Sequence, residues 1–125
     1  EQPTPLLVPL VEEGWLEHPA TGAVLQTYLA PMLERGMDTL LLACTHYPLL
    51  VPALEEQLGG KVRLVDSATT CAHFLREHLT ELGLLAAPGE ARFEIHLTDL
   101  SEEFEGLARR FLATEVGRIR RVELG

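Results

Sequence analysis

Short apolar runs alternate with segments of helical periodicity along this chain, and this alternation limits the possible folds more than any other feature. Leu6–Val11 and Thr39–Ala43 are short apolar runs of strand length, which indicate buried strands. The continuous run Thr39–Ala43 is typical of parallel strands that are buried on both faces of a sheet, and Val62–Val65 is a further predicted strand. Over Ala20–Glu34, and again from Ser67, apolar residues recur as on one face of an amphipathic helix. Strands that alternate with helices predict a three-layer α/β fold with a mostly parallel sheet.

Prolines, glycines and capping residues predict where the elements end. Pro31 lies inside the first helical pattern and predicts a kink or an early end, because proline lacks the amide hydrogen that a helix interior uses. The other predicted elements are a helix from Pro48 or Pro52 to Leu58, a strand at Val62–Val65, a helix from its N-cap Ser67 to Gly83, a loop at Ala86–Glu90, a strand at Phe93–Leu97, a helix from Ser101 and an edge strand at Ile119–Leu124.

The charge balance excludes several classes of partner. The 125 residues include 19 acidic residues against 10 Lys and Arg, which gives a net charge of −9. Nucleic-acid binding rests on clustered Lys and Arg, so we expect no nucleic-acid partner, and no anionic membrane surface either. The longest apolar run, Tyr47–Leu54, is too short to span a bilayer. Two cysteines are too few for a disulfide scaffold, which predicts a cytoplasmic protein.

The best candidate for a functional site is the tripeptide Cys44, Thr45 and His46, which follows the apolar run Thr39–Ala43. Ligands of doubly wound sheets bind at the carboxyl ends of the strands. A thiol near a helix N-terminus favours the thiolate, and an imidazole exchanges a proton near neutral pH. The Thr45 hydroxyl and the first amides of the next helix would hold a substrate carboxylate. The alternative is that Cys44 is a small buried residue without a chemical role.

Cys71 and His73 repeat the Cys-x-His spacing, which raises the question of a zinc site. On a helix, an offset of two residues turns two side chains about 200° apart, so these two cannot converge on one ion. We therefore expect no metal site, with Cys71 in the core and His73 and His78 in solvent. Lys61, the single lysine, lies beside a Gly-Gly turn, which disfavours pyridoxal phosphate chemistry.

Two segments carry a resemblance to a known family. Asp38–Leu50, DTLLLACTHYPLL, resembles the second catalytic-cysteine motif of bacterial glutamate racemases, with Ala43 where that family commonly has Gly. Leu7–Gly14, LVPLVEEG, resembles a family segment at a suitable distance upstream. Val65–Ser67 and the acid-rich Ser101–Phe111 resemble later segments less specifically. The resemblance covers essentially the whole chain but only the C-terminal half of the enzyme, without the first cysteine or the substrate-binding Asp-Ser-Gly loop.

The resemblance implies a cofactor-independent isomerase that interconverts L- and D-glutamate for peptidoglycan synthesis, and so for cell-wall biogenesis and cell shape. Two thiols face opposite sides of the α-carbon; one removes the α-proton and the other delivers a proton, since a single base would return it to the face it left. By this resemblance Cys44 is the second thiol and acts on the L-enantiomer. Thr45 contacts the substrate, His46 is the proton partner of Cys44, and Glu12 supports that thiol. A solvated acid at a strand end is the alternative for Glu12.

The resemblance also implies a domain boundary. The family has two α/β domains that face each other across the active-site cleft, and its chain returns to the first domain near the end. Residues 1–66 would then be part of the second domain, and residues 67–125 would return to the first. The chain begins at Glu1 without methionine or a secretory signal, as expected of a piece of a longer product. Alone it is expected to be inactive, because the first catalytic cysteine is absent.

Other functions stay open at this stage. An aspartate-type amino-acid racemase is a close variant, although His46-Tyr47-Pro48 after Cys-Thr favours the glutamate member. A thiol hydrolase or a non-catalytic α/β binding module is a different class. A nucleophile elbow needs small residues two positions either side of the nucleophile, and around Cys44 those residues are Leu42 and His46, a poor fit. A homodimer is left open.

Overall fold

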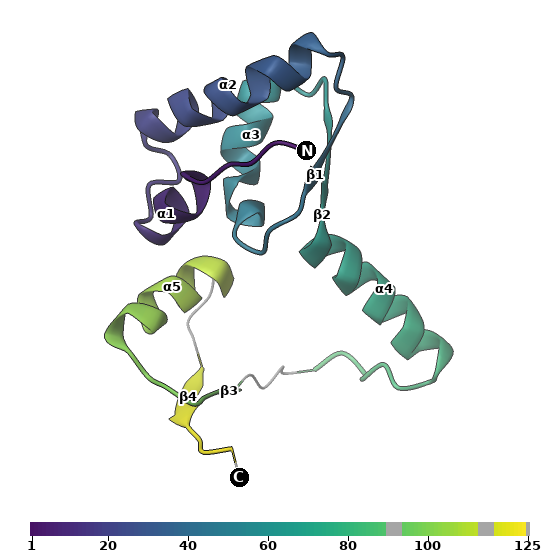
Figure 1. Cartoon of the computed structure of the whole chain (residues 1–125). Helices are drawn as coiled ribbons and strands as arrows, with labels where there is room; N and C mark the ends of the chain where they lie inside the picture. The colour runs from purple at the N-terminus through teal and green to yellow at the C-terminus, as the bar shows by residue number, and fades with distance from the viewer. Residues whose placement is uncertain (90–93, 113–116, 125) are drawn as a thin grey trace. The chain divides into compact units, whose positions relative to one another are not determined.

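The structure is a computed structural model that describes residues 1–89, 94–112 and 117–124. The chain forms two compact units, Glu1–Leu85 and Ala86–Gly125, and each is described by itself (Figure 1). In chain order the first unit contains α1 (Leu7–Glu12), α2 (Pro19–Glu34), β1 (Thr39–Leu42), the 3-10 helix η1 (Tyr47–Leu50), α3 (Val51–Leu58), β2 (Arg63–Asp66) and α4 (Ser67–Glu81).

The first unit is built on two parallel strands joined by a helical crossover. β1 pairs with β2, with Thr39 opposite Arg63 and Leu42 opposite Asp66. The crossover consists of η1 and α3, as parallel neighbours require. It ends at Gly59, whose φ of 57° is a left-handed value that glycine adopts without a steric penalty. These bounds confirm the predicted α/β class with parallel strands.

The core of this unit lies between the helices and one face of β1. Helices α1, α2 and α3 lie on the same side of the strand pair (Figure 1). Successive strand residues point to opposite faces, and Leu42 is accordingly 3% exposed whereas Leu41 is 64% exposed. Only one face of β1 is thus covered by the described residues. The core consists of Leu7, Val11, Leu25, Leu29, Leu42, Leu50, Leu54, Leu58 and Val62.

The prediction of a strand at Leu6–Val11 was wrong, because the segment forms α1. A short apolar run has the same appearance in a buried strand and in a buried helix turn. Leu7 and Val11, four residues apart, share one helix face and are both buried. Pro9 is the third helical residue, where the missing amide hydrogen leaves no bond unmade.

Of the two outcomes predicted at Pro31, a kink or an early end, the early end does not occur, since α2 continues to Glu34. The buried face of this helix is formed by Thr21, Leu25 and Leu29, which pack against the core on the preceding turns. Tertiary packing supplies most of the stability of a helix in a protein, and here it outweighs the single backbone hydrogen bond that proline removes.

Helix α4 is capped by Asp66, and not by Ser67 as predicted. Asp66 has extended backbone angles, and its Oδ1 accepts a hydrogen bond of 2.7 Å from the Thr69 amide. This bond is the largest cause that holds the pKa of Asp66 below the ordinary value of 3.8, because it favours the ionised carboxylate. The helix ends at Glu81, followed by Gly83 with a positive φ of 66°.

Asp66→Asn should remove the pH dependence of this cap while keeping a side-chain acceptor. A folded-state pKa below the unfolded value adds stability that is present above the unfolded pKa and is lost as the pH falls through the folded pKa. We therefore expect the melting temperature of the parent chain, relative to Asp66→Asn, to fall as the pH drops below about 4. Thermal circular dichroism at a series of pH values between about 2 and 7 measures the melting temperatures of both proteins. A difference in melting temperature that does not change with pH would contradict the assignment.

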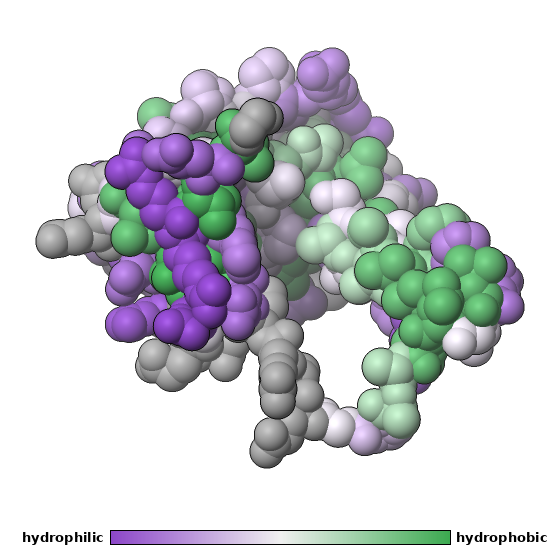
Figure 2. All heavy atoms as spheres, turned by 90° about the horizontal axis from the view of Figure 1, so that it is seen from below, coloured by the Kyte–Doolittle hydropathy of each residue, from purple (hydrophilic) through white to green (hydrophobic). Residues whose placement is uncertain are grey.

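None of the residues of α4 is buried, and its apolar side chains are exposed apart from Leu79, which is half-buried. Figure 2 shows hydrophobic residues gathered over the region of α4 and the segment after it. The prediction that Cys71 belongs to the core was wrong for this chain, because Cys71 is exposed. His73 and His78 are exposed, as predicted. The exposed apolar side chains of α4 and the segment after it are Phe74, Leu75, Leu82, Leu84 and Leu85.

The second unit contains β3 (Glu94–Leu97), α5 (Glu102–Leu112) and β4 (Arg118–Arg121). β3 and β4 are parallel, with Ile95 opposite Ile119. The hydroxyl of Ser101 accepts a hydrogen bond of 3.2 Å from the amide of Phe104 at the start of α5, which confirms the predicted helix start. Phe93 and Glu90 lie outside the described residues.

In the part of the chain that the structure describes, no helix is long and apolar enough to cross a membrane.

Candidate active site

The turn that carries Cys44, Thr45 and His46 begins two residues after the end of β1. The amide of Tyr47 donates a hydrogen bond of 3.2 Å to the carbonyl of Cys44 and closes the turn. The 3-10 helix η1 starts at Tyr47. The structure therefore places the tripeptide at the carboxyl end of a parallel strand, as the sequence predicted.

His46 lies between the thiol and a carboxylate. Its Nδ1 is 3.9 Å from Sγ of Cys44, and its Nε2 is 3.4 Å from Oε1 of Glu12. Nδ1 also lies 3.5 Å from the hydroxyl of Thr45. A carboxylate that accepts the Nε2 hydrogen leaves Nδ1 as the acceptor for a thiol proton. The order Glu12, His46, Cys44 is thus suited to withdraw a proton from the thiol and to return it.

Helix α1 brings Glu12 to His46. Glu12 is the last residue of α1, and an acidic side chain at a helix C-terminus opposes the helix dipole. A histidine partner offsets this unfavourable position. Leu7 and Val11 of α1 are buried with Leu50 of η1 in one core, so the helix that carries Glu12 and the helix that follows His46 are packed against each other.

The site is accessible from solvent. Cys44 is half-buried, and the side chains of His46 and Glu12 are 24% and 53% exposed. Thr45 is exposed beside them. A small molecule can therefore reach the thiol, while the imidazole is covered enough to keep its orientation.

The four predicted site residues lie together, but the expected contribution of helical amides is not supported at two positions. The amide of Tyr47 donates a hydrogen bond to the backbone carbonyl of Cys44, and the amide of Leu49 donates one to the backbone carbonyl of His46, both at 3.2 Å. Both groups are thus occupied within the turn and do not point to an anion. Thr45 is an exposed polar group beside the thiol, and its hydroxyl lies 3.5 Å from Nδ1 of His46.

Sequence reasoning missed one contact near the site. The hydroxyl of Tyr47 is hydrogen-bonded to the hydroxyl of Thr4. The two residues are 43 positions apart, and no pattern in the sequence links them. The only available signal was the polar hydroxyl on an otherwise apolar stretch after His46.

Among the residues that the structure describes, no group of three or more His, Cys, Asp or Glu side chains is placed to hold a metal ion.

Comparison with known proteins identifies the relatives of this chain. No family model matches it. A glutamate racemase of Neisseria meningitidis serogroup A is 43% identical over 125 residues, and one of Syntrophus aciditrophicus is 44% identical over 124 residues. These alignments cover 99% and 95% of this chain but 46% and 44% of the relatives. The chain therefore spans about half the length of the curated relatives it matches.

Solved structures agree with the sequence comparison. Glutamate racemase from Thermus thermophilus, in complex with beta-chloro-D-alanine, matches with a TM-score of 0.84 and 37% identity, over 98% of this chain and 47% of that one. This chain is homologous to the C-terminal half of glutamate racemases. Glutamate racemase from Francisella tularensis in complex with D-glutamate matches with a TM-score of 0.80 and 27% identity, over 94% of this chain and 44% of that racemase.

Proposed function

We propose that the protein containing this chain interconverts L- and D-glutamate without a cofactor, and that Cys44 is one of its two thiol acid/base groups. The observation that supports this most is that His46 contacts both Glu12 and Cys44. Its Nε2 lies 3.4 Å from Oε1 of Glu12, and its Nδ1 lies 3.9 Å from Sγ of Cys44. His46 withdraws the thiol proton, the Cys44 thiolate takes the α-proton of L-glutamate, and a second thiol delivers a proton to the opposite face.

The remaining roles follow from the placement of the side chains. Thr45, exposed beside the thiol, binds a polar group of the substrate. Glu12 holds His46 in the orientation that leaves Nδ1 toward the thiol. The D-glutamate formed would serve peptidoglycan synthesis, which is a cytoplasmic role. The homology with glutamate racemases named from both sequence and structure supports the choice of substrate.

The second thiol belongs to the part of the protein outside this chain. Cys71, the other cysteine here, lies on α4. We infer that residues 1–66 are part of the second α/β domain and that residues 67–125 return to the first. The exposed side chains Phe74, Leu75 and Leu82 of the α4 region would then pack on that first domain, since solvent exposure of such a surface is unfavourable.

Substrate preference tests the function directly. The full-length protein that contains this chain should convert L-glutamate to D-glutamate, measured by chiral chromatography, without added metal or cofactor. L-aspartate should be converted at least about a hundredfold less efficiently, because a carboxylate held one carbon too close leaves site groups unpaired. A preference for L-aspartate would assign the protein to the aspartate-type racemases, and ester hydrolysis without racemisation would assign it to the thiol hydrolases.

Glu12→Gln should lower kcat by about ten- to a hundredfold, the scale of one charge-assisted hydrogen bond. The glutamine side chain has the same size, but its neutral amide oxygen accepts a hydrogen bond from the imidazole more weakly than the carboxylate does. The imidazole is therefore held less firmly. Glu13→Gln is the matched control, because Glu13 is the adjacent exposed acid and makes no ion pair with His46 among the described residues. Equal kcat values for the two variants would show that Glu12 is only a solvated acid.

A further inference from the structure

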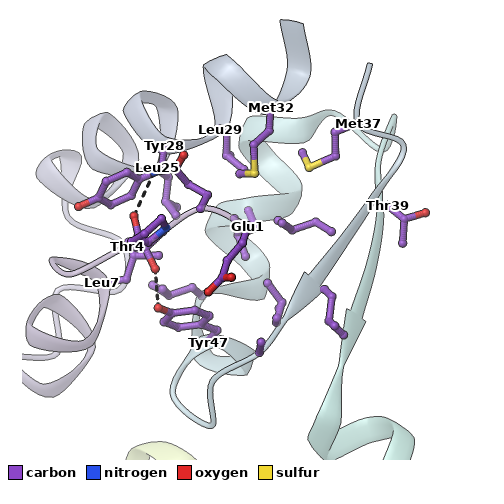
Figure 3. A pocket seen from close by; sticks show the side chains of 18 residues that line it. Glu1, Thr4, Leu7, Leu25, Tyr28, Leu29, Met32, Met37, Thr39 and Tyr47 are labelled. Atoms are coloured by element: carbon purple, nitrogen blue, oxygen red, sulfur yellow. Dashed lines mark hydrogen bonds between the residues drawn. The ribbon is translucent and has the colours of Figure 1, made fainter. Parts of the chain in front are cut away.

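Two hydroxyl groups connect the N-terminal segment to the turn of the site. The hydroxyls of Tyr47 and Thr4 are hydrogen-bonded in a partly buried position. Both residues line a cavity of about 540 Å³ between the N-terminal segment, α2 and β1 (Figure 3). Leu25, Leu29 and Met32 are among its apolar walls. A hydrogen bond in such surroundings is stronger than one in water and holds its geometry better.

The backbone of each partner is fixed at a different end of the site. The Tyr47 amide donates to the Cys44 carbonyl at 3.2 Å and closes the turn. The Thr4 carbonyl accepts from the Leu7 amide at 3.1 Å, at the start of α1. Helix α1 carries Glu12 at its other end. One side-chain hydrogen bond therefore joins the segment that carries Glu12 to the turn that carries Cys44 and His46.

The contacts of His46 have little tolerance for displacement. A sulfur hydrogen bond of 3.9 Å and an ion pair of 3.4 Å lie near the long end of the distances at which such groups interact. A shift of α1 against the turn by a few tenths of an ångström would weaken both contacts together. Packing alone permits such a shift, because apolar contacts are not directional, whereas a hydrogen bond between hydroxyls is directional.

We propose that Tyr47 is a positioning residue of the candidate site: through Thr4 it fixes the turn of Cys44 and His46 against α1, and so aligns His46 with Glu12. The catalytic consequence rests on the proposed racemase function, but the effect on the reactivity of Cys44 does not. The tyrosine ring packs against the core, so removing the hydroxyl alone leaves that packing in place.

The rate of Cys44 alkylation tests the alignment without relying on racemisation. The 125-residue chain with Cys71→Ala leaves one thiol, and mass spectrometry follows its reaction with iodoacetamide. Because the thiolate is the reactive form, Tyr47→Phe should slow alkylation by about three- to tenfold, the scale of one hydrogen bond. Thr4→Val should have the same effect, the double variant should add nothing, and Thr4→Ser should restore the rate.

Tyr28→Phe is the matched control. Tyr28 lines the same cavity (Figure 3), and its hydroxyl makes no hydrogen bond to the residues that the structure describes. We expect no change in the alkylation rate for this variant. An equal loss in Tyr28→Phe, or an unchanged rate in Tyr47→Phe at an unchanged melting temperature, would overturn the proposal.

Racemisation by the full-length protein then separates this proposal from the proposed function. Tyr47→Phe should lower kcat about three- to tenfold with little change in KM. In a Glu12→Gln background the same substitution should cost less, because the alignment it maintains has lost its partner; fully multiplicative losses would contradict the coupling. Slower alkylation in a protein that does not racemise glutamate would support the positioning role and overturn the proposed function alone.

Discussion

Replacement of Cys44 by alanine in the full-length protein is expected to lower glutamate racemisation by about a hundredfold to ten-thousandfold, the usual contribution of a positioned acid/base group. The side chain lies 3.9 Å from the imidazole that serves it, and no other thiol of this chain is placed beside His46. Cys44→Ser should fail as well, because a hydroxyl is a far weaker acid than a thiol and does not ionise near neutral pH. Both losses should appear in kcat.

Cys71→Ala is the matched control for this prediction. Cys71 is exposed on α4 in this chain, and His46 contacts Cys44, Thr45 and Glu12. We expect its kcat and KM to equal those of the parent protein, with at most a modest loss of stability. Circular dichroism should show that all three variants fold. Retention of a tenth of the parent activity by Cys44→Ala would contradict the assignment of Cys44.

The second large effect concerns the 125-residue chain alone, which should form no detectable D-glutamate. A proton transfer to each face of the α-carbon needs two bases, and the second is expected outside this chain. Co-expression with the remaining half of the protein should restore activity. Formation of D-glutamate by the chain alone, lost on Cys44→Ala, would show that both bases lie within these residues.

The same chain is expected to self-associate through the exposed apolar side chains of the α4 region. Phe74 is 66% and Leu82 is 56% exposed, and contiguous surfaces of this kind associate in water. Phe74→Ser should therefore reduce the sedimentation coefficient toward that of a monomer. Phe104→Ser, in the second unit, is the comparison. A parent chain that is already monomeric would argue against this surface as the contact with the first domain.

The sequence was informative where strand and helix lengths differ. The run after Asp38 is followed by a polar tripeptide and two prolines, and it forms β1 with η1 and α3 after it. The helices from Pro19 and Ser67 were predictable because their apolar positions recur over four turns or so. The carboxyl end of β1 then places Cys44, Thr45 and His46 in the turn where the contacts with Glu12 form.

Short or partnerless segments were not predictable. Leu6–Val11 is too short for its periodicity to separate a strand from a helix, and only the packing of Leu7 and Val11 decides it. Cys71 was expected in the core because α4 has an apolar face, but the described residues bury no side chain of that face. Glu12 was reached through the family resemblance alone. The Tyr47–Thr4 bond arises from tertiary proximity, which no local pattern encodes.

The fate of the α-hydrogen tests the central claim most directly. The full-length protein is allowed to convert a small fraction of L-glutamate in D₂O, and both enantiomers are analysed by chiral separation and mass spectrometry. Two thiols on opposite faces predict D-glutamate that carries deuterium at the α-carbon, while the remaining L-glutamate stays largely protiated, and they predict no deuterium in either enantiomer beyond background when L-glutamate is incubated with Cys44→Ala. D-glutamate that keeps the original hydrogen, or an unchanged deuterium pattern in Cys44→Ala, would contradict the account.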